Sequence, residues 1–327
     1  MSLPNILIYA LLAILILSLT IIIVSTIYFT FLLIPIKKFS TNFTIEDGLK
    51  KSEFSQNELN EDKVEFSFTS RFGYILKGQI FVRDLQKVVF FNHGVTWTLY
   101  GMYKYMIPFL SKDYTCILFD SKGHGESGGG FPTYEYYEKY DLYDCYHSII
   151  EFLRERFLGN DISQDTISYK PIVGLFGESM GAAITLQSLN LFHHGEISFC
   201  ILDSPFSDLE KLCKFQLEKS LKIKILAKIV FNFSKLLVYL LARFDINKIK
   251  PIEIDPKVNV PILLFHGEQD NLIPNFMSNQ IYEKRKGIAL TELYIIEDSD
   301  HTKGFMLDKN FYVEKIFDFI EKAIGKP

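Results

Sequence analysis

The chain has 327 residues, and 48% of them are hydrophobic, including 30 Phe and 18 Tyr. This is enough apolar material for a sizeable core, in one large α/β domain or two small ones. The formal net charge of −4 argues against nucleic acid as a partner. The four cysteines show no metal-ligand spacing, so the sequence predicts no metal site and buried, reduced thiols; a disulfide is an unsupported alternative.

The N-terminal segment is apolar throughout. Residues 1–36 contain no charged side chain, and residues 6–33 are almost wholly apolar. About 20 such residues cross a bilayer core, so residues 1–38 are predicted to form an N-terminal transmembrane helix that anchors the chain. A cleaved signal peptide would have a basic start and a shorter apolar run, which favours an uncleaved single-pass anchor.

The charges that flank this segment predict its orientation. Lys37 and Lys38 follow it and no Lys or Arg precedes it, so the positive-inside rule places the rest of the chain on the cytoplasmic side. Two Asn-X-Ser/Thr sequons, at residues 42–44 and 232–234, would indicate the opposite side if they were glycosylated. Residues 39–62 are polar and mixed in charge, and we expect them to form a linker.

The remaining chain, residues 63–327, alternates between strand and helix patterns. Strand character appears at residues 64–69, 74–82, 88–92, 115–119, 171–176, 197–202, 262–265 and 290–296. Helical character appears at residues 100–110, 134–157, 182–191, 277–286 and 304–324. This alternation predicts an α/β fold with a mostly parallel eight-stranded sheet and helices on both faces. The leading hairpin followed by this alternation is the order of the α/β-hydrolase fold.

Residues 177–181 read GESMG and lie where a predicted strand turns into a predicted helix. This is the context of a G-x-S-x-G nucleophile elbow. The two glycines allow strand and helix to approach closely, and the helix N-terminus favours the negative charge that develops in acyl transfer. A chance match to a short pattern is the alternative; the strand-turn-helix context favours Ser179 as a catalytic nucleophile.

A carboxylate and an imidazole follow the last two predicted strands. Asp270 lies in the loop after the seventh strand and His301 in the loop after the eighth. Because ligands bind at the carboxyl ends of parallel strands, we expect both side chains near Ser179, with Asp270 orienting the imidazole and His301 acting as general base. For Asp270 the alternative is an Asx turn, with Asp203 as the reserve acid; for His301 it is a solvated loop side chain.

The loop after the third predicted strand begins with His93, Gly94 and Val95. An oxyanion hole needs two backbone N–H donors, and we assign them to Val95 and to Met180, the residue after the nucleophile. Gly94 lets the backbone approach the substrate. An ordinary turn is the alternative for this loop.

Residues 120–129 read DSKGHGESGG. The stretch lacks the Lys-Ser/Thr of a Walker loop and the spacing of a dinucleotide fingerprint, so it predicts a tight structural loop beside the active site and no phosphate site.

Residues 205–250 form a helical insertion rich in Lys and large apolar residues, which predicts a cap. Residues 225–241 are apolar enough to suggest a second membrane span, but Lys228 and Lys235 interrupt them. We expect an amphipathic cap that partly touches lipid and that shapes, with Trp97, an apolar pocket for the substrate.

These motifs together resemble the serine aminopeptidase-like (monoglyceride-lipase-like) family of the α/β-hydrolase superfamily. The resemblance covers residues 64–325 and is carried by HG at 93–94, FDSKGHGESGG at 119–129, YYEKYDL at 136–142, GESMGA at 177–182, HGEQD at 266–270 and DH at 300–301. It implies Ser179 as nucleophile, Asp270 as acid and His301 as base, with Val95 and Met180 as oxyanion donors. Such families include esterases, lipases, thioesterases and peptidases, so the resemblance leaves the substrate open.

The sequence therefore predicts a membrane-anchored serine hydrolase that cleaves carboxylic esters or thioesters through an acyl-enzyme, without a cofactor. Its expected partners are a small acyl ester or lipid-like substrate and the membrane. The alternatives are a serine aminopeptidase-like peptidase and a catalytically silent membrane scaffold with the same fold.

Overall fold

The computed structural model describes residues 3–35, 38–158 and 169–325. These residues divide into two compact units. The helical unit contains the described residues of 1–36 and 209–248, and the sheet unit contains those of 37–208 and 249–327.

The helical unit is built around the apolar N-terminal helix. Its elements are α1 (Leu3–Leu33), α7 (Leu209–Leu221), α8 (Lys224–Ala242) and the 3₁₀ turn η2 (Ile246–Lys248). Helix α1 packs against α8, where Ser234 Oγ donates a hydrogen bond of 3.2 Å to the carbonyl oxygen of Thr26. Among the described helices, α1 and α8 are the two that are long and apolar enough to cross a membrane. The N-terminal apolar helix predicted from the sequence is therefore present.

The sheet unit contains one eight-stranded sheet with the order β1-β2-β4-β3-β5-β6-β7-β8. Its strands are β1 (Val64–Thr69), β2 (Ile75–Phe81), β3 (Asp84–Asn92), β4 (Tyr114–Phe119), β5 (Ile172–Glu178), β6 (Phe199–Asp203), β7 (Ile262–Gly267) and β8 (Thr291–Ile296). Strand β2 pairs antiparallel with β1 and with β4, and all the other neighbours pair parallel. This confirms the predicted mostly parallel sheet with a leading hairpin.

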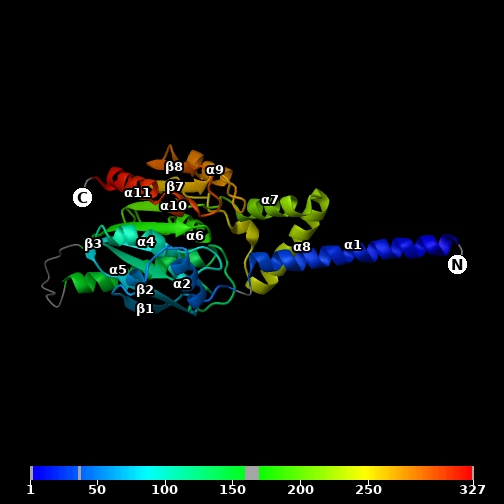
Figure 1. Ribbon diagram of the computed structural model, residues 1–327, viewed down its shortest axis with the longest axis horizontal. Helices are drawn as coiled ribbons and strands as arrows, with labels where there is room; N and C mark the ends of the chain where they lie inside the picture. The colour runs from blue at the N-terminus through cyan, green and yellow to red at the C-terminus, as the bar shows by residue number, and fades with distance from the viewer. Residues whose placement is uncertain (1–2, 36–37, 159–168, 326–327) are drawn as a thin grey trace. The chain divides into compact units, whose positions relative to one another are not determined.

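Helices cover both faces of the sheet (Figure 1). The helices of the sheet unit are α2 (Thr41–Lys50), α3 (Gln56–Leu59), η1 (Leu99–Met102), α4 (Tyr103–Leu110), α5 (Glu138–Leu158), α6 (Met180–Ser188), α9 (Phe276–Arg285), α10 (Gly304–Leu307) and α11 (Lys309–Ile324). Neighbouring residues of β3 show the two faces. The ring of Phe90 lies 5.8 Å from that of Tyr146 on α5, and the ring of Phe91 lies 5.5 Å from that of Phe109 on α4. This alternation follows from the two-residue period of a strand.

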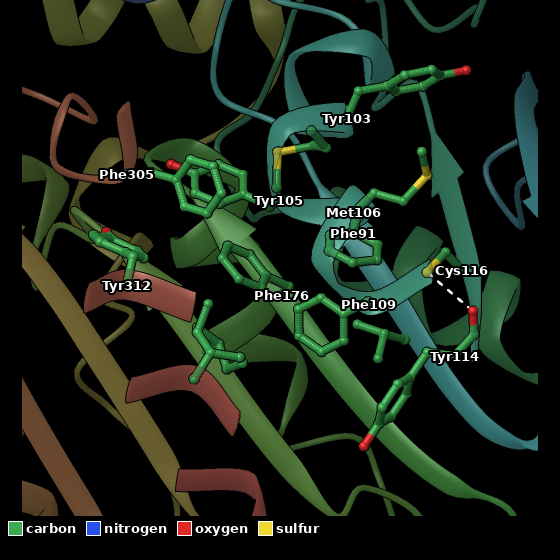
Figure 2. Close-up of a cluster of buried hydrophobic side chains, with 14 of the residues drawn as sticks. Phe91, Tyr103, Tyr105, Met106, Phe109, Tyr114, Cys116, Phe176, Phe305 and Tyr312 are labelled. Atoms are coloured by element: carbon green, nitrogen blue, oxygen red, sulfur yellow. Dashed lines mark hydrogen bonds between the residues drawn. The ribbon is translucent and has the colours of Figure 1, made fainter. Parts of the chain in front are cut away.

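The core between the sheet and helices α4 and α11 is strongly aromatic (Figure 2). Tyr105 of α4 packs 4.7 Å from Phe176 of β5, and Tyr312 of α11 stacks 3.7 Å from Phe265 of β7. Burial of each such side chain contributes about 2–3 kcal/mol. The strand that leads to the elbow, β5, is thus packed against a rigid, close-packed aromatic layer.

Two segments differ locally from their sequence predictions. Residues 39–62, expected as a linker, contain α2 and α3, and Phe54 between these helices is 4% exposed and belongs to the core. The C-terminal helix, expected over residues 304–324, is divided at Asp308, whose carboxylate accepts a hydrogen bond of 3.0 Å from the Phe311 N–H and caps α11.

Candidate active site

The strand-to-helix turn at Ser179 has the geometry of a nucleophile elbow. Strand β5 ends at Glu178 and α6 begins at Met180. Between them Ser179 has φ 56° and ψ −116°, a conformation that costs a non-glycine residue free energy and holds its side chain in a fixed direction. The Ser179 N–H donates 2.8 Å to the carbonyl oxygen of Asp203 at the end of β6. The neighbouring strand therefore helps to hold the strained backbone.

The glycines on either side of the elbow are required by space. A Cβ atom on Gly177 would lie 2.4 Å from the carbonyl oxygen of Gly181, and one on Gly181 would lie 2.0 Å from that of Asn92. Both contacts are with backbone, which cannot move aside without displacing a strand or a helix. The G-x-S-x-G spacing is thus explained by packing as well as by chemistry.

We expect Gly181→Ala to destabilise the protein by about 3 kcal/mol or more, because the added methyl group overlaps the backbone of β3. Thermal unfolding of the purified full chain in detergent measures the effect. Gly287→Ala is the matched control, since a Cβ there meets nothing within 4 Å, and it should change stability by less than about 1 kcal/mol. Equal melting temperatures for the two variants would contradict the packing argument.

The structure brings Ser179, His301 and Asp270 together in one chain of hydrogen bonds. His301 Nε2 lies 2.9 Å from Ser179 Oγ, and His301 Nδ1 lies 2.7 Å from Asp270 Oδ2. The three residues follow β5, β7 and β8, so each comes from the carboxyl end of a strand, as the sequence predicted. This arrangement can move a proton from the serine hydroxyl to the imidazole while the carboxylate stabilises the cation that forms.

Asp270 is held as an ionised acceptor. Its Oδ1 accepts the N–H groups of Leu272 and Ile273 at 2.9 and 2.8 Å, which is the Asx turn considered for this residue. Burial alone would raise the pKa of this carboxyl, but hydrogen bonds from His266 and His301 outweigh it and hold the pKa well below its usual range. The turn is therefore compatible with the predicted acid role, because the turn uses Oδ1 and His301 contacts Oδ2.

His266 is a contact of the site that the sequence did not reveal. Its Nε2 lies 2.7 Å from the carbonyl oxygen of Ile273 and 3.2 Å from Asp270 Oδ2. Its Nδ1 lies 2.6 Å from the hydroxyl of Ser278 on α9. The hydroxyl can donate to Nδ1, so Nε2 carries the proton and faces the carbonyl and the carboxylate. In the sequence this histidine appears only within the HGEQD stretch at 266–270, with no role assigned to it.

Asp203, the reserve acid, is engaged elsewhere. Its Oδ2 accepts the hydroxyls of Tyr105 and Tyr312 at 2.5 and 2.7 Å, and its Oδ1 accepts that of Ser204 at 2.8 Å. Burial raises the pKa of this carboxyl. The carboxylate that contacts His301 is that of Asp270.

A buried ion pair lies directly before the nucleophile. Lys104 Nζ of α4 is 2.8 Å from Glu178 Oε2, and both side chains are 7% exposed. Burial would lower the pKa of Lys104, but the charges of Glu178 and Glu53 outweigh it and raise the pKa. The ion pair thus ties the elbow to α4. Sequence reasoning missed this ion pair, because its partners meet only through tertiary packing.

The loop after β3 lies against the elbow. A Cβ atom on Gly94 would be 3.4 Å from Ser179 Cβ, so this loop passes beside the nucleophile. Met180 is the first residue of α6, where the N–H has no intrahelical acceptor. Val95 thus follows a glycine that lies beside the nucleophile, and the Met180 N–H is free of an intrahelical acceptor. The role of these two N–H groups as an oxyanion hole stays a prediction.

Two neutral histidines fix the shape of that loop. Because His93 Nε2 accepts the Ser121 N–H at 2.9 Å, its Nδ1 carries the proton and donates 2.8 Å to the Gly94 carbonyl oxygen. The planar peptide then fixes the opposite direction for the Val95 N–H. His124 Nε2 accepts the Thr96 N–H at 3.1 Å. Burial lowers the pKa of both histidines, which keeps them as acceptors.

The glycine-rich stretch of residues 120–129 is a closed loop stabilised by its own hydrogen bonds. The Gly123 N–H donates to the carbonyl oxygen of Gly128 at 2.6 Å, and Asp120 accepts the N–H groups of Leu99 and Glu126 at 2.8 and 3.0 Å. This geometry fits the structural role expected from the sequence.

Trp97, predicted to line a substrate pocket, lies in an aromatic cluster. Its ring is 5.1 Å from that of Phe39 and 6.5 Å from that of Phe43, and Lys51 Nζ lies 5.5 Å from its centroid. Its contact with substrate stays a prediction.

Three comparisons relate this geometry to known proteins. The sequence model of the alpha/beta hydrolase fold family matches residues 87–222. The esterase Pf2001 of Pyrococcus furiosus superposes with a TM-score of 0.60 at 22% identity, over 83% of this chain and 97% of that one. The chain has the alpha/beta hydrolase fold. The esterase EaEST of Exiguobacterium antarcticum is similar in fold, with a TM-score of 0.54 at 18% identity, over 78% of this chain and 98% of that one.

A relative that covers more of the sequence has no assigned activity. The uncharacterized protein YqkD of Bacillus subtilis (strain 168) is 27% identical over 286 residues, which is 85% of this chain and 87% of that protein. Within residues 3–35, 38–158 and 169–325, the structure contains no group of three His, Cys, Asp or Glu side chains placed to hold a metal ion.

Proposed function

We propose that this protein is a membrane-anchored serine hydrolase that cleaves carboxylic esters or thioesters through an acyl-enzyme. The observation that carries the proposal is the hydrogen-bond chain from Ser179 Oγ to His301 to Asp270, with distances of 2.9 and 2.7 Å, at a strained elbow. A nucleophile, a base and an orienting acid are the complete set that acyl transfer requires.

In the first half of the reaction, Ser179 Oγ bonds to the carbonyl carbon of the substrate and its proton passes to His301 Nε2. The carbonyl π electrons move to the oxygen, which accepts hydrogen bonds from the Val95 and Met180 N–H groups. When the carbonyl re-forms, the bond to the leaving alcohol or thiol breaks and the leaving group takes the proton from His301. Asp270 stabilises the imidazolium between these two transfers.

In the second half, water replaces the leaving group. His301 takes a proton from water, the hydroxide oxygen bonds to the acyl carbon, and collapse of the intermediate breaks the bond to Ser179. The proton returns to Ser179 Oγ, and the carboxylic acid leaves. Each step uses only side chains and backbone groups of this chain, so the proposal includes no cofactor.

The substrate class is inferred from the similar proteins, because a serine beside one imidazole base serves esterases and peptidases alike. Both solved structures described above are named as esterases. We therefore favour a small acyl ester or a lipid-like ester over an aminoacyl amide. The peptidase and silent-scaffold alternatives remain outcomes of the test.

We further propose that residues 1–38 anchor the protein and that α7 and α8 form a cap at the membrane. Helix α8 packs on α1 and exposes large apolar side chains, namely Ile225, Phe233, Leu236, Tyr239, Leu240 and Leu241. The flanking lysines favour the cytoplasmic face of the bilayer. We expect the full chain to remain in the membrane pellet after alkaline carbonate extraction, and its release would contradict the anchor.

The function is tested with the full chain in detergent. A fluorophosphonate probe should label it, and a panel of acyl esters of increasing chain length should be hydrolysed faster than matched aminoacyl anilides. Faster anilide cleavage would show a peptidase instead. A folded protein that neither reacts with the probe nor hydrolyses any ester would support the scaffold alternative and end the hydrolase proposal.

A further inference from the structure

The segment that follows the N-terminal helix is bound to the loop that carries Val95. We call residues 38–44 the strap. Lys38 Nζ donates to the carbonyl oxygens of Gly123 and Gly130, the latter at 2.7 Å. Gly123 belongs to the glycine-rich loop, and Gly130 directly follows it; the same loop supplies His124, the acceptor for the Thr96 N–H. The strap therefore contacts the glycine-rich loop, which in turn supports the loop that carries Val95.

The strap also contacts the loop itself. The Phe39 N–H donates 2.9 Å to the carbonyl oxygen of Thr96, and the Phe39 ring packs on Trp97. Thr96 has φ 70°, a left-handed conformation that is unfavourable for a β-branched residue and persists only where surrounding contacts hold it. The strap and His124 supply hydrogen bonds to both sides of this residue, at its C=O and its N–H.

A buried contact joins the last residue of the strap, Thr44, to Thr98. The hydroxyls of Thr44 and Thr98 are 2.7 Å apart, and both side chains are almost fully buried. Thr44 Oγ1 can donate to the carbonyl oxygen of Thr41 at 2.9 Å and accept from Thr98. The loop is thus attached to the strap by contacts at residues 96, 97 and 98.

We infer that the strap is a positioning element that holds the Val95 N–H in the oxyanion hole, so that catalysis depends on the segment joining the anchor to the sheet unit. The inference rests on the proposed function. Val95 directly precedes Thr96, and a small displacement of a catalytic donor lowers the rate steeply.

Two strap variants of the full chain test the inference. We expect Lys38→Met and Thr44→Val to lower kcat roughly tenfold to a hundredfold while KM changes less than twofold, since the N–H acts on the transition state more than on the bound substrate. The inhibition constant of a trifluoromethyl ketone, whose tetrahedral adduct places an oxyanion in the same hole, should rise in parallel. Thr44→Ser keeps the hydroxyl and should restore activity. Lys50→Met is the control, because this exposed lysine of α2 lies outside the strap.

Hydrogen exchange of amides 94–98 gives a second measurement that needs no activity. It should accelerate in both strap variants and stay unchanged in Lys50→Met. If the wild-type protein reacts with a fluorophosphonate but the folded variants keep kcat, the inhibition constant and the exchange rates, the strap inference is wrong and the hydrolase proposal stands. If the wild-type protein fails to react, the hydrolase proposal fails, and unchanged exchange would separately exclude the strap.

Discussion

Ser179→Ala is expected to abolish ester hydrolysis and fluorophosphonate labelling. The substitution removes the only atom that can form the acyl bond, and loss of such a nucleophile costs on the order of 10⁵- to 10⁶-fold in kcat. The hydroxyl is 2.9 Å from His301 Nε2, so the loss should concern chemistry and leave KM nearly unchanged for esters whose binding equilibrates faster than the chemical step. Steady-state kinetics and in-gel detection of the labelled band measure both effects.

Ser188→Ala is the matched control for this variant. Ser188 ends the same helix α6, is buried, and donates its hydroxyl to the Thr185 carbonyl oxygen at 2.8 Å. Helix stability changes little when a serine of this kind becomes alanine, so labelling and turnover should persist. Labelling of Ser179→Ala at the wild-type rate would show that another residue is the nucleophile and would remove the basis of the proposed function.

The elbow could be predicted because one short stretch contains all of its requirements. Strand pattern, two glycines and serine lie within ten residues, and the backbone atoms that a Cβ would overlap at Gly177 and Gly181 show why both must lack a side chain. Asp270 and His301 could be predicted as neighbours of Ser179 because parallel strands place their carboxyl ends at one edge of the sheet. The position of each residue in the loop after a strand was enough for this prediction. The fold could be predicted because strands and helices have clearly different hydrophobic periods, so their alternation is visible in the sequence.

Other contacts of the site could not be predicted from the sequence, because they join residues far apart in the chain without a local pattern. Lys104 and Glu178 are separated by 74 positions, and their ion pair exists only once α4 packs beside β5. The strap is a similar case. Its composition is typical of a linker, and its fixed conformation depends on contacts with residues near 96 and 123. Local propensity carries no information about such tertiary partners.

Asp270→Asn is expected to lower kcat by about 10⁴-fold, or roughly 5 kcal/mol, with the structure otherwise intact. The direction of the amide decides the effect. Two backbone N–H groups, from Leu272 and Ile273, point at Oδ1 and require an oxygen there. The Asn NH₂ group must then take the Oδ2 position, which lies 2.7 Å from His301 Nδ1. Two N–H donors would then face each other, with no acceptor between them.

To avoid that clash, His301 must move its proton from Nδ1 to Nε2, which then donates to Ser179 and cannot accept its proton. Burst kinetics with an activated ester should show slow acylation. Asp298→Asn is the matched control: it makes the same substitution in the loop after β8, where Asp298 is exposed and accepts from the Gln269 side chain at 2.8 Å. Asn tolerates its φ of 52°, so activity should change less than about twofold. A loss below tenfold for Asp270→Asn would mean that the carboxylate does not orient the base, and the assigned role of Asp270 would be wrong.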